Sequence, residues 1–192
     1  MKVIKIGGGS LKDKETIEHI FDLIATRGKG NIFVLSALNG VTDALIDGMS
    51  AALADENTIP EIISDLRSKH TLVARQLISN CDGLEVFGRD LDKSLSELDR
   101  LYYGLNFTRE ITPRMRDMIS SYGERFAVEL FTSALRCRGI NAAYRMPEEI
   151  GLYTDGKFGD ATANLRKTTN NLQQNLTPLL NEGKILFIPG FF

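Results

Sequence analysis

A lysine and three glycines near the start of the chain could bind a phosphate group. Lys5 lies inside a short apolar stretch that is typical of a β-strand, and Gly7, Gly8, Gly9 and Ser10 follow it. An ammonium group inside a strand is costly to bury unless it meets an anion. Glycines let backbone amides approach a ligand closely, and the N-terminus of the helix predicted next favours negative charge. These residues therefore predict a phosphate site.

The same arrangement also has a purely structural interpretation. A strand, a glycine turn and a helix follow one another in many α/β proteins, and a lysine on an edge strand is ordinary. The spacing of the glycines matches neither the P-loop motif nor the dinucleotide-binding fingerprint. On this stretch alone, both interpretations stay open.

A second polar loop is predicted to lie beside the first one. The apolar run at residues 32–35 is typical of a buried parallel strand, and it leads directly into a loop that contains Ser36, Gly40 and Thr42. The carboxyl ends of parallel strands meet at one edge of a sheet, where ligands bind. Ser36 and Thr42 could offer hydroxyl groups there. Alternatively, Thr42 or Asp43 could serve only as the N-cap of the next helix.

Glu124 is a candidate binding residue on a long predicted helix. Its neighbours at three and four residues are Ser120, Ser121, Ala127 and Val128. These side chains are small enough for a ligand or another segment to approach the carboxylate. The alternative is an ordinary solvent-exposed glutamate on a helix surface.

Hydrophobic periodicity divides the chain into alternating strands and helices, with a helical stretch in the middle. Strands are predicted at about 2–6, 32–35, 141–145 and 185–188. Helices are predicted at about 13–27, 42–53, 60–80, 88–106, 113–137 and 162–180. Ser10 or Asp13 is expected to cap the first helix and Thr112 the fifth, a break is expected at 80–83, and Pro178 is expected to interrupt or kink the last helix. This order predicts an α/β fold with a helical insertion at about 43–110.

Composition and charge exclude several classes of protein. A net charge of −2 gives no electrostatic reason for binding nucleic acid or an anionic membrane, and no apolar run approaches the length of a transmembrane helix. Cys81 and Cys137 are isolated, which predicts reduced thiols in a cytoplasmic protein. His19 and His70 stand alone, so neither a histidine metal site nor a catalytic triad is indicated, and we predict no metal ligands.

Five stretches, in the same order and spacing, resemble aspartate kinases within the amino-acid kinase family. They are Lys5-Ile6-Gly7-Gly8-Gly9-Ser10, Ser36-Ala37-Leu38-Asn39-Gly40-Val41-Thr42-Asp43, residues 112–117 with Ser121-Tyr122-Gly123-Glu124, Thr154-Asp155 with Phe158-Gly159-Asp160-Ala161, and Ile188-Pro189-Gly190-Phe191. Two residues depart from the family pattern: Ile6 stands where the family has an aromatic residue, and Gly9 where it has a threonine. The second departure removes a hydroxyl group from the loop.

The resemblance implies a three-layer α/β/α sandwich with a mostly parallel sheet. It also implies ATP-dependent phosphorylation of the β-carboxylate of L-aspartate to 4-phospho-L-aspartate, the first step toward lysine, threonine and methionine, with Mg²⁺ accompanying ATP. By position, Lys5 would act as the catalytic residue that neutralises phosphate charge, and the residues from Gly7 to Ser10 would bind the phosphates. Ser36, Thr42 and Phe158 would line the substrate pocket, and Glu124 would bind the substrate's ammonium group.

The resemblance covers only the N-terminal, aspartate-binding part of such a kinase. The family pattern continues into a nucleotide-binding half and regulatory domains, which we do not find in residues 1–192. We therefore expect a truncated kinase domain with little activity of its own; robust turnover would contradict this. A homo-oligomer is compatible with the sequence.

Two alternatives remain at this point. The chain could be another member of the same family, although the helical stretch at 43–110 and the Ser-Tyr-Gly-Glu segment favour an aspartate kinase over the more compact acetylglutamate kinases. It could also be a non-catalytic binding or assembly module, if Phe192 is its natural C-terminus.

Overall fold

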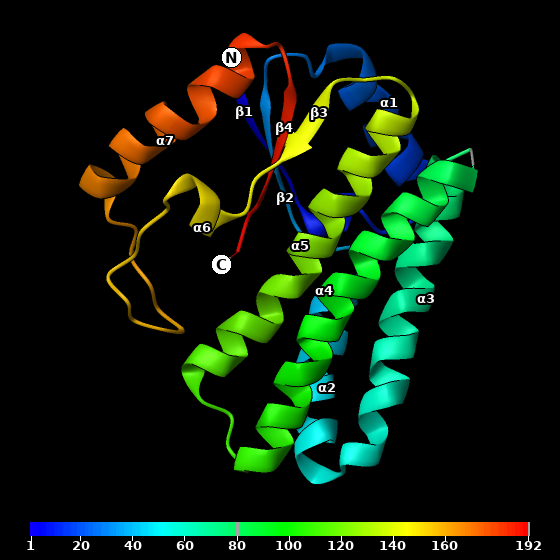
Figure 1. The fold of residues 1–192 in the computed structure, drawn as a ribbon, viewed down its shortest axis with the longest axis vertical. Coiled ribbons are helices and arrows are strands. Elements are labelled where there is room, and N and C mark those ends of the chain that lie inside the picture. The colour runs from blue at the N-terminus through cyan, green and yellow to red at the C-terminus, as the bar shows by residue number, and fades with distance from the viewer. Residues whose placement is uncertain (80, 192) are drawn as a thin grey trace.

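A parallel sheet forms the centre of the fold (Figure 1). The computed structural model describes residues 1–79 and 81–191. Within them the sheet has four strands in the order β1-β2-β4-β3. The strands are β1 Val3–Ile6, β2 Ile32–Leu35, β3 Ala142–Tyr144 and β4 Ile185–Pro189. All four predicted strands are thus present, with boundaries shifted by at most one residue.

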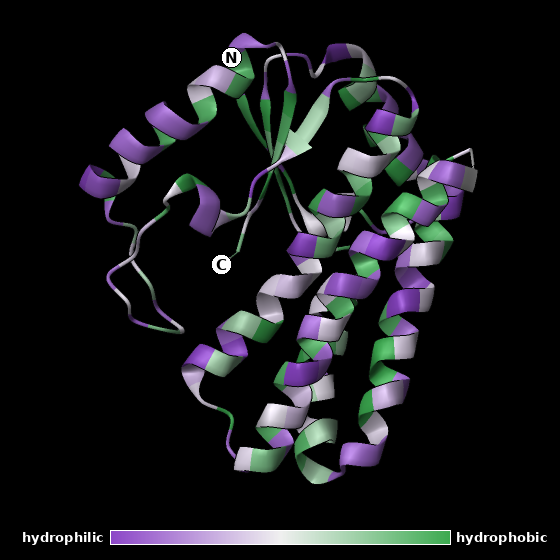
Figure 2. Cartoon of the chain, viewed as in Figure 1, coloured by the Kyte–Doolittle hydropathy of each residue, from purple (hydrophilic) through white to green (hydrophobic). Residues whose placement is uncertain are grey.

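Helices cover both faces of this sheet, which confirms the predicted three-layer α/β/α sandwich. Successive residues of a strand point to opposite faces, and β4 shows this alternation clearly. Ile185 and Phe187 belong to the larger hydrophobic cluster, whereas Leu186 and Ile188 belong to a second cluster on the other face. Because both faces are covered, the strands are almost uniformly apolar, as their green colour in Figure 2 shows.

The larger layer contains the first five helices of the chain. They are α1 Lys14–Arg27, α2 Val41–Ala54, α3 Ile59–Leu77, α4 Cys81–Thr108 and α5 Pro113–Cys137. The helices α2 to α5 pack against one another as a bundle that extends past the carboxyl ends of the strands (Figure 1). The opposite layer consists of the short helix α6 Pro147–Ile150 and of α7 Leu165–Asn181. Among the described residues, no helix is both long and apolar enough to cross a bilayer.

Aromatic side chains hold α5 on the sheet. The ring of Phe131 on α5 lies 6.1 Å from that of Phe187 on β4 and 6.1 Å from that of Phe21 on α1. All three side chains are fully buried. Such aromatic packing adds favourable ring geometry to a large buried area. It places the C-terminal part of α5 against the sheet, so the preceding turns of the helix reach past the strand ends.

Side-chain caps begin the helices α1, α5 and α7. Asp13 accepts a hydrogen bond from the amide of Thr16 at 2.9 Å, so Asp13, rather than Ser10, caps α1. Thr112 caps α5 by accepting from the amide of Met115 at 3.1 Å, as predicted. Asn164 caps α7, which therefore begins three residues later than predicted. These caps satisfy amides that have no partner inside a helix.

The helices differ from the predictions at three places. A helix break was predicted at 80–83, but α4 already begins at Cys81 and includes Gly83. Asn80, the first residue of the predicted break, lies outside the described residues. Pro178 does not interrupt α7, which continues to Asn181, since a proline in the last turn removes only one hydrogen bond near the helix end. The short helix α6 was not predicted, because one turn is too short to show a hydrophobic period.

Candidate active site

The two predicted loops lie against each other at the carboxyl edge of the sheet. The amide of Ser36 donates to the carbonyl of Ile6 at 3.0 Å, and the amide of Asn39 donates to that of Leu11 at 3.1 Å. A Cβ atom on Gly8 would lie 3.3 Å from the carbonyl oxygen of Ala37. A glycine at position 8 therefore allows this close packing of one loop on the other.

The glycine turn leaves two backbone donors available. Residues Gly8–Ser10 form one 3-10 turn, in which the amides of Ser10 and Leu11 donate to Gly7 and Gly8 at 2.9 Å each. Within the described part of the chain, the amides of Gly8 and Gly9 donate to no backbone carbonyl outside regular structure and to no side chain. Free amides beside a lysine are the donors that a phosphate group needs.

Gly123 sets the distance between α5 and the second loop. This packing role of Gly123 was not predicted from the sequence. A Cβ atom at this position would lie 2.8 Å from the Cβ of Ala37 and 3.2 Å from Cγ1 of Val41. Because real side chains almost never approach so closely, only glycine fits here without a shift. A glycine inside a long helical pattern was the one available signal.

Gly123→Ala should therefore destabilise the fold, by about 1–3 kcal/mol, because the added methyl group overpacks a tight contact. Gly104→Ala on α4 is a matched control, since a Cβ atom added at Gly104 would have no atom within 4 Å. That control should stabilise the chain by about 0.5–1 kcal/mol through helix propensity. Urea unfolding measures both variants, and equal effects of the same sign would contradict the packing argument.

Glu124 reaches the strand ends from α5. Its Oε2 atom would lie 3.2 Å from a Cβ atom on Gly190, just beyond β4. The Gly190 amide already donates a hydrogen bond to the carbonyl of Leu35 at 3.0 Å. Oε2 is buried and has no hydrogen-bond partner among the described residues. A buried carboxylate oxygen without a partner is unfavourable unless a ligand supplies a donor.

Burial raises the pKa of the Glu124 carboxyl above its ordinary value. The backbone amides of Phe191 and Gly190 and the ammonium group of Lys5 act in the opposite direction, but burial dominates. The influence of Lys5 shows that the two side chains lie within electrostatic range of each other across the sheet edge. A cation bound at Oε2 would favour the ionised carboxylate.

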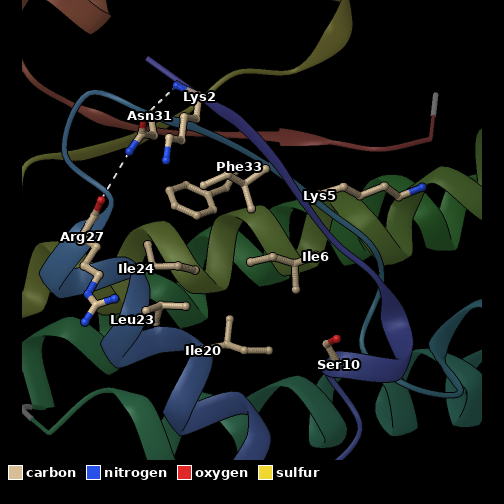
Figure 3. A pocket seen from close by; sticks show the side chains of 11 residues that line it. Lys2, Lys5, Ile6, Ser10, Ile20, Leu23, Ile24, Arg27, Asn31 and Phe33 are labelled. Atoms are coloured by element: carbon tan, nitrogen blue, oxygen red, sulfur yellow. Dashed lines mark hydrogen bonds between the residues drawn. The ribbon is translucent and has the colours of Figure 1, made fainter.

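Lys5 is exposed and points away from the apolar layer beneath β1. Figure 3 shows its side chain extending away from Ile6, Ile24 and Phe33. Those residues help to line a mainly apolar hollow of about 410 Å³ between β1 and α1. The ammonium group of Lys5 is therefore directed away from this hollow, which we do not assign to the candidate site.

The structure places Ser36 and Thr42 differently. Ser36 is half-buried directly after β2 and contacts the glycine turn, whereas Thr42 is exposed in the first turn of α2. The alternative of Thr42 or Asp43 as the N-cap is wrong: Gly40 is the N-cap, with a φ of 72°, and no side chain caps this helix. Glycine adopts this left-handed conformation without strain.

Phe158 is held at the start of α5, apart from the strand-end residues. The guanidinium carbon of Arg114 lies 5.6 Å from the centre of its ring, and the amide of Gly159 donates to Oδ2 of Asp117 at 2.6 Å. Asp117 precedes Glu124 by seven residues, which is roughly 10 Å along a helix. The described contacts thus bring Lys5, the glycine turn, Ser36 and Glu124 together, but they do not bring Phe158 to them.

This arrangement can bind an anion and an ammonium group side by side. The anion would meet Lys5 and the free amides of the glycine turn, and the ammonium group would meet Oε2 of Glu124. Among the described residues, no group of three or more Asp, Glu, His or Cys side chains is placed to hold a metal ion. The arrangement therefore fits a zwitterion next to a phosphate group.

Known proteins resemble this chain over most of its length. Aspartokinase 1, chloroplastic, from Arabidopsis thaliana is 29% identical over 161 residues, which are 81% of this chain and 27% of that protein. Aspartokinase 3 from Bacillus subtilis is 25% identical over 201 residues, which cover 100% of this chain and 40% of that protein. The chain therefore spans less than half the length of these relatives.

A solved structure shows the same fold. The crystal structure of E. coli aspartokinase III in complex with aspartate and ADP matches with a TM-score of 0.81 at 21% sequence identity, over 98% of this chain and 40% of that chain. A model of the Amino acid kinase family matches residues 1–192. With this match over its whole length, the chain belongs to the amino acid kinase family.

Proposed function

We propose that this chain forms the aspartate-binding side of an ATP-dependent aspartate kinase. The observation that carries the proposal is the buried, unpartnered Oε2 atom of Glu124 at the strand ends, within electrostatic range of Lys5. An α-amino acid would supply the missing donor through its ammonium group. The chain's similarity to aspartokinases supports aspartate as that amino acid.

In the proposed reaction, the β-carboxylate of L-aspartate attacks the γ-phosphorus of ATP, and the bond from that phosphorus to the bridging oxygen of ADP breaks. Glu124 holds the substrate's ammonium group and so orients the carboxylate. Lys5 and the amides of Gly8 and Gly9 stabilise charge on the phosphoryl oxygens, and Ser36 and Thr42 offer hydroxyl groups nearby. Such a reaction depends on positioning and charge stabilisation and needs no covalent enzyme intermediate.

Nucleotide binding would need more than these side chains. Mg²⁺ would enter with ATP and neutralise phosphate charge, as it does for kinases in general. We assign no protein ligand to it, because the described residues contain no metal-binding cluster. The relatives are also much longer than this chain, so we propose that full activity requires residues beyond those described.

Ligands that differ only in the ammonium group test this proposal. L-Aspartate should bind, whereas succinate, which lacks the ammonium group, and N-acetyl-L-aspartate, which has it blocked, should bind at least roughly tenfold more weakly. Isothermal titration calorimetry on the 192-residue chain measures all three. Equal affinity for succinate and L-aspartate would contradict the role of Glu124, and tighter binding of L-glutamate would indicate a different acid as substrate.

A further inference from the structure

A second polar pocket lies beside α5, on a different face from Glu124. It has a volume of about 220 Å³ and is enclosed by α4, α5, β3 and the start of α6. Glu129 lines it, five residues after Glu124. Five residues correspond to a rotation of about 140° around a helix, so the two carboxylates point in different directions.

Glu129 is the buried acceptor of this pocket. Glu129 is only 4% exposed to solvent. Oε1 accepts a hydrogen bond from the hydroxyl of Ser94 at 2.9 Å. Oε2 is buried and has no hydrogen-bond partner within the described part of the chain. Since a buried carboxylate oxygen without a partner is unfavourable, this atom points to a missing donor.

The charges around Glu129 favour a cation as the missing group. Three further carboxylates line the pocket and are exposed at its rim, those of Asp90, Glu97 and Glu149. The two cationic side chains of the lining are Lys93 and Arg125. Carboxylates thus outnumber cations.

Arg125 is also engaged elsewhere. Its two terminal nitrogens donate to Glu148 at 2.8 and 3.2 Å, and Glu148 does not line the pocket. This ion pair offsets part of its charge. Lys93 is exposed, so its ammonium group can remain in water. The pocket keeps an excess of negative charge.

We propose that this pocket binds a small organic cation through a primary ammonium group, with Oε2 of Glu129 as the principal acceptor. Tyr122 and Tyr144 also line the pocket, and aromatic rings attract ammonium groups. The ring of Tyr122 already faces the guanidinium group of Arg125 at 5.9 Å, so Tyr144 is the aromatic residue available to the ligand. An inorganic metal ion fits less well, because no three acidic, histidine or cysteine side chains in the described residues are grouped closely enough to coordinate one. The proposal does not depend on the aspartate kinase function.

The titration behaviour of Glu129 agrees with this assignment. The pKa of its carboxyl is raised to about 7, mainly by burial and to a smaller extent by the charges of Asp90 and Glu97, while Ser94 and Arg125 oppose the shift. A bound ammonium group would favour the ionised form. Binding near neutral pH should therefore release protons from Glu129 to the buffer.

Ethylammonium chloride is the probe for the proposed ammonium site. Ethanol is the uncharged control of similar size, and potassium chloride is the control with an inorganic cation. Amide chemical shifts of the 192-residue chain are followed by NMR at pH 8 during each titration. We expect saturable binding of ethylammonium in the millimolar range, with shifts at residues that include Ser94 and Tyr144. Glu129→Gln should weaken the binding reported by the shifts of Ser94 and Tyr144 at least tenfold. Glu124→Gln, which alters the separate ammonium site proposed for L-aspartate, should leave the shifts of these two pocket residues unchanged.

The Gln variant of Glu129 keeps the size of the side chain and removes a buried charge, so it should fold. Calorimetry in two buffers of different ionisation enthalpy gives an independent readout, because wild type should release protons on binding at pH 7 and Glu129→Gln should not. The proposal is overturned if ethanol or potassium chloride shifts Ser94 and Tyr144 as strongly as ethylammonium does, or if these shifts do not saturate with ethylammonium. It is also overturned if Glu129→Gln leaves the shifts of these two residues intact.

Discussion

Glu124→Gln is expected to weaken L-aspartate binding by roughly 10- to 100-fold, which is the range for a hydrogen bond to a charged group. Oε2 of Glu124 is buried without a partner, and we propose that it receives the substrate's ammonium group. Glutamine keeps the shape of the side chain but offers no negative charge to that group. Titration calorimetry with L-aspartate measures the loss.

The same substitution is expected to stabilise the ligand-free chain at pH 8. Burial raises the pKa of Glu124, which means that folding disfavours its ionised form. Removing the charge removes this penalty, so the melting temperature should rise as binding is lost. Such an opposition is typical of residues that serve a ligand rather than the fold.

Glu129→Gln provides the control for the affinity measurement, because it removes the other buried carboxylate of α5 and leaves Glu124 in place. It should leave the affinity for L-aspartate unchanged. If Glu124→Gln lowered both the melting temperature and the content of folded chain, Glu124 would be a structural residue. Unchanged affinity in Glu124→Gln would remove it from the site.

The second large effect concerns the dependence of stability on pH, to which Glu129 and His70 contribute with opposite signs. The pKa of Glu129 is raised to about 7 in the folded chain, so this chain holds more protons than the unfolded chain between about pH 4.5 and 7. Its free energy of unfolding should therefore fall as the pH rises through this range. For a pKa shift of this size, the ionisation of Glu129 lowers the free energy of unfolding by about 3 kcal/mol in total across this pH range.

His70 acts in the other direction. Its ring is fully buried, Nδ1 lies 2.7 Å from the carbonyl oxygen of Leu66, and the ring of Phe126 is 4.9 Å away. Burial, with a smaller contribution from Lys69, lowers its pKa to about 4. The unfolded chain then holds more protons between about pH 6.5 and 4, so His70 should lower stability by about 3 kcal/mol as the pH falls through this range.

Single variants separate the two contributions, which largely cancel in the wild type. Glu129→Gln should lose stability steeply between pH 6.5 and 4, because only the His70 effect remains. His70→Leu should instead gain stability as the pH falls from 7 to 4.5. Urea unfolding at intervals of pH between 4 and 8 measures the slopes, which do not depend on any constant packing defect of a variant. Parallel curves for wild type and both variants would contradict these assignments.

Much of the secondary structure could be predicted from the sequence. The strands at β2 and β4 are continuous apolar runs, and the caps at Asp13 and Thr112 stand directly before amphipathic helices. These are local signals that act within a few residues. The start of α4 at Cys81 could not be predicted in this way, because Asp82 and Gly83 are typical of a break and the packing of α4 on three other helices overrides that preference.

The sequence by itself determined which segments could form a site. Strand–loop order places the glycine turn and the loop after β2 at the same edge of a parallel sheet, whatever the details of packing. It singled out Glu124 by its small neighbours and its motif, but it did not distinguish Glu129 among the 25 acidic side chains of the chain. Only the tertiary structure decided that these two carry buried oxygens without partners. Burial and hydrogen bonding depend on segments far apart in the chain, such as Gly190 beside Glu124 and Ser94 beside Glu129, and no local pattern encodes those contacts.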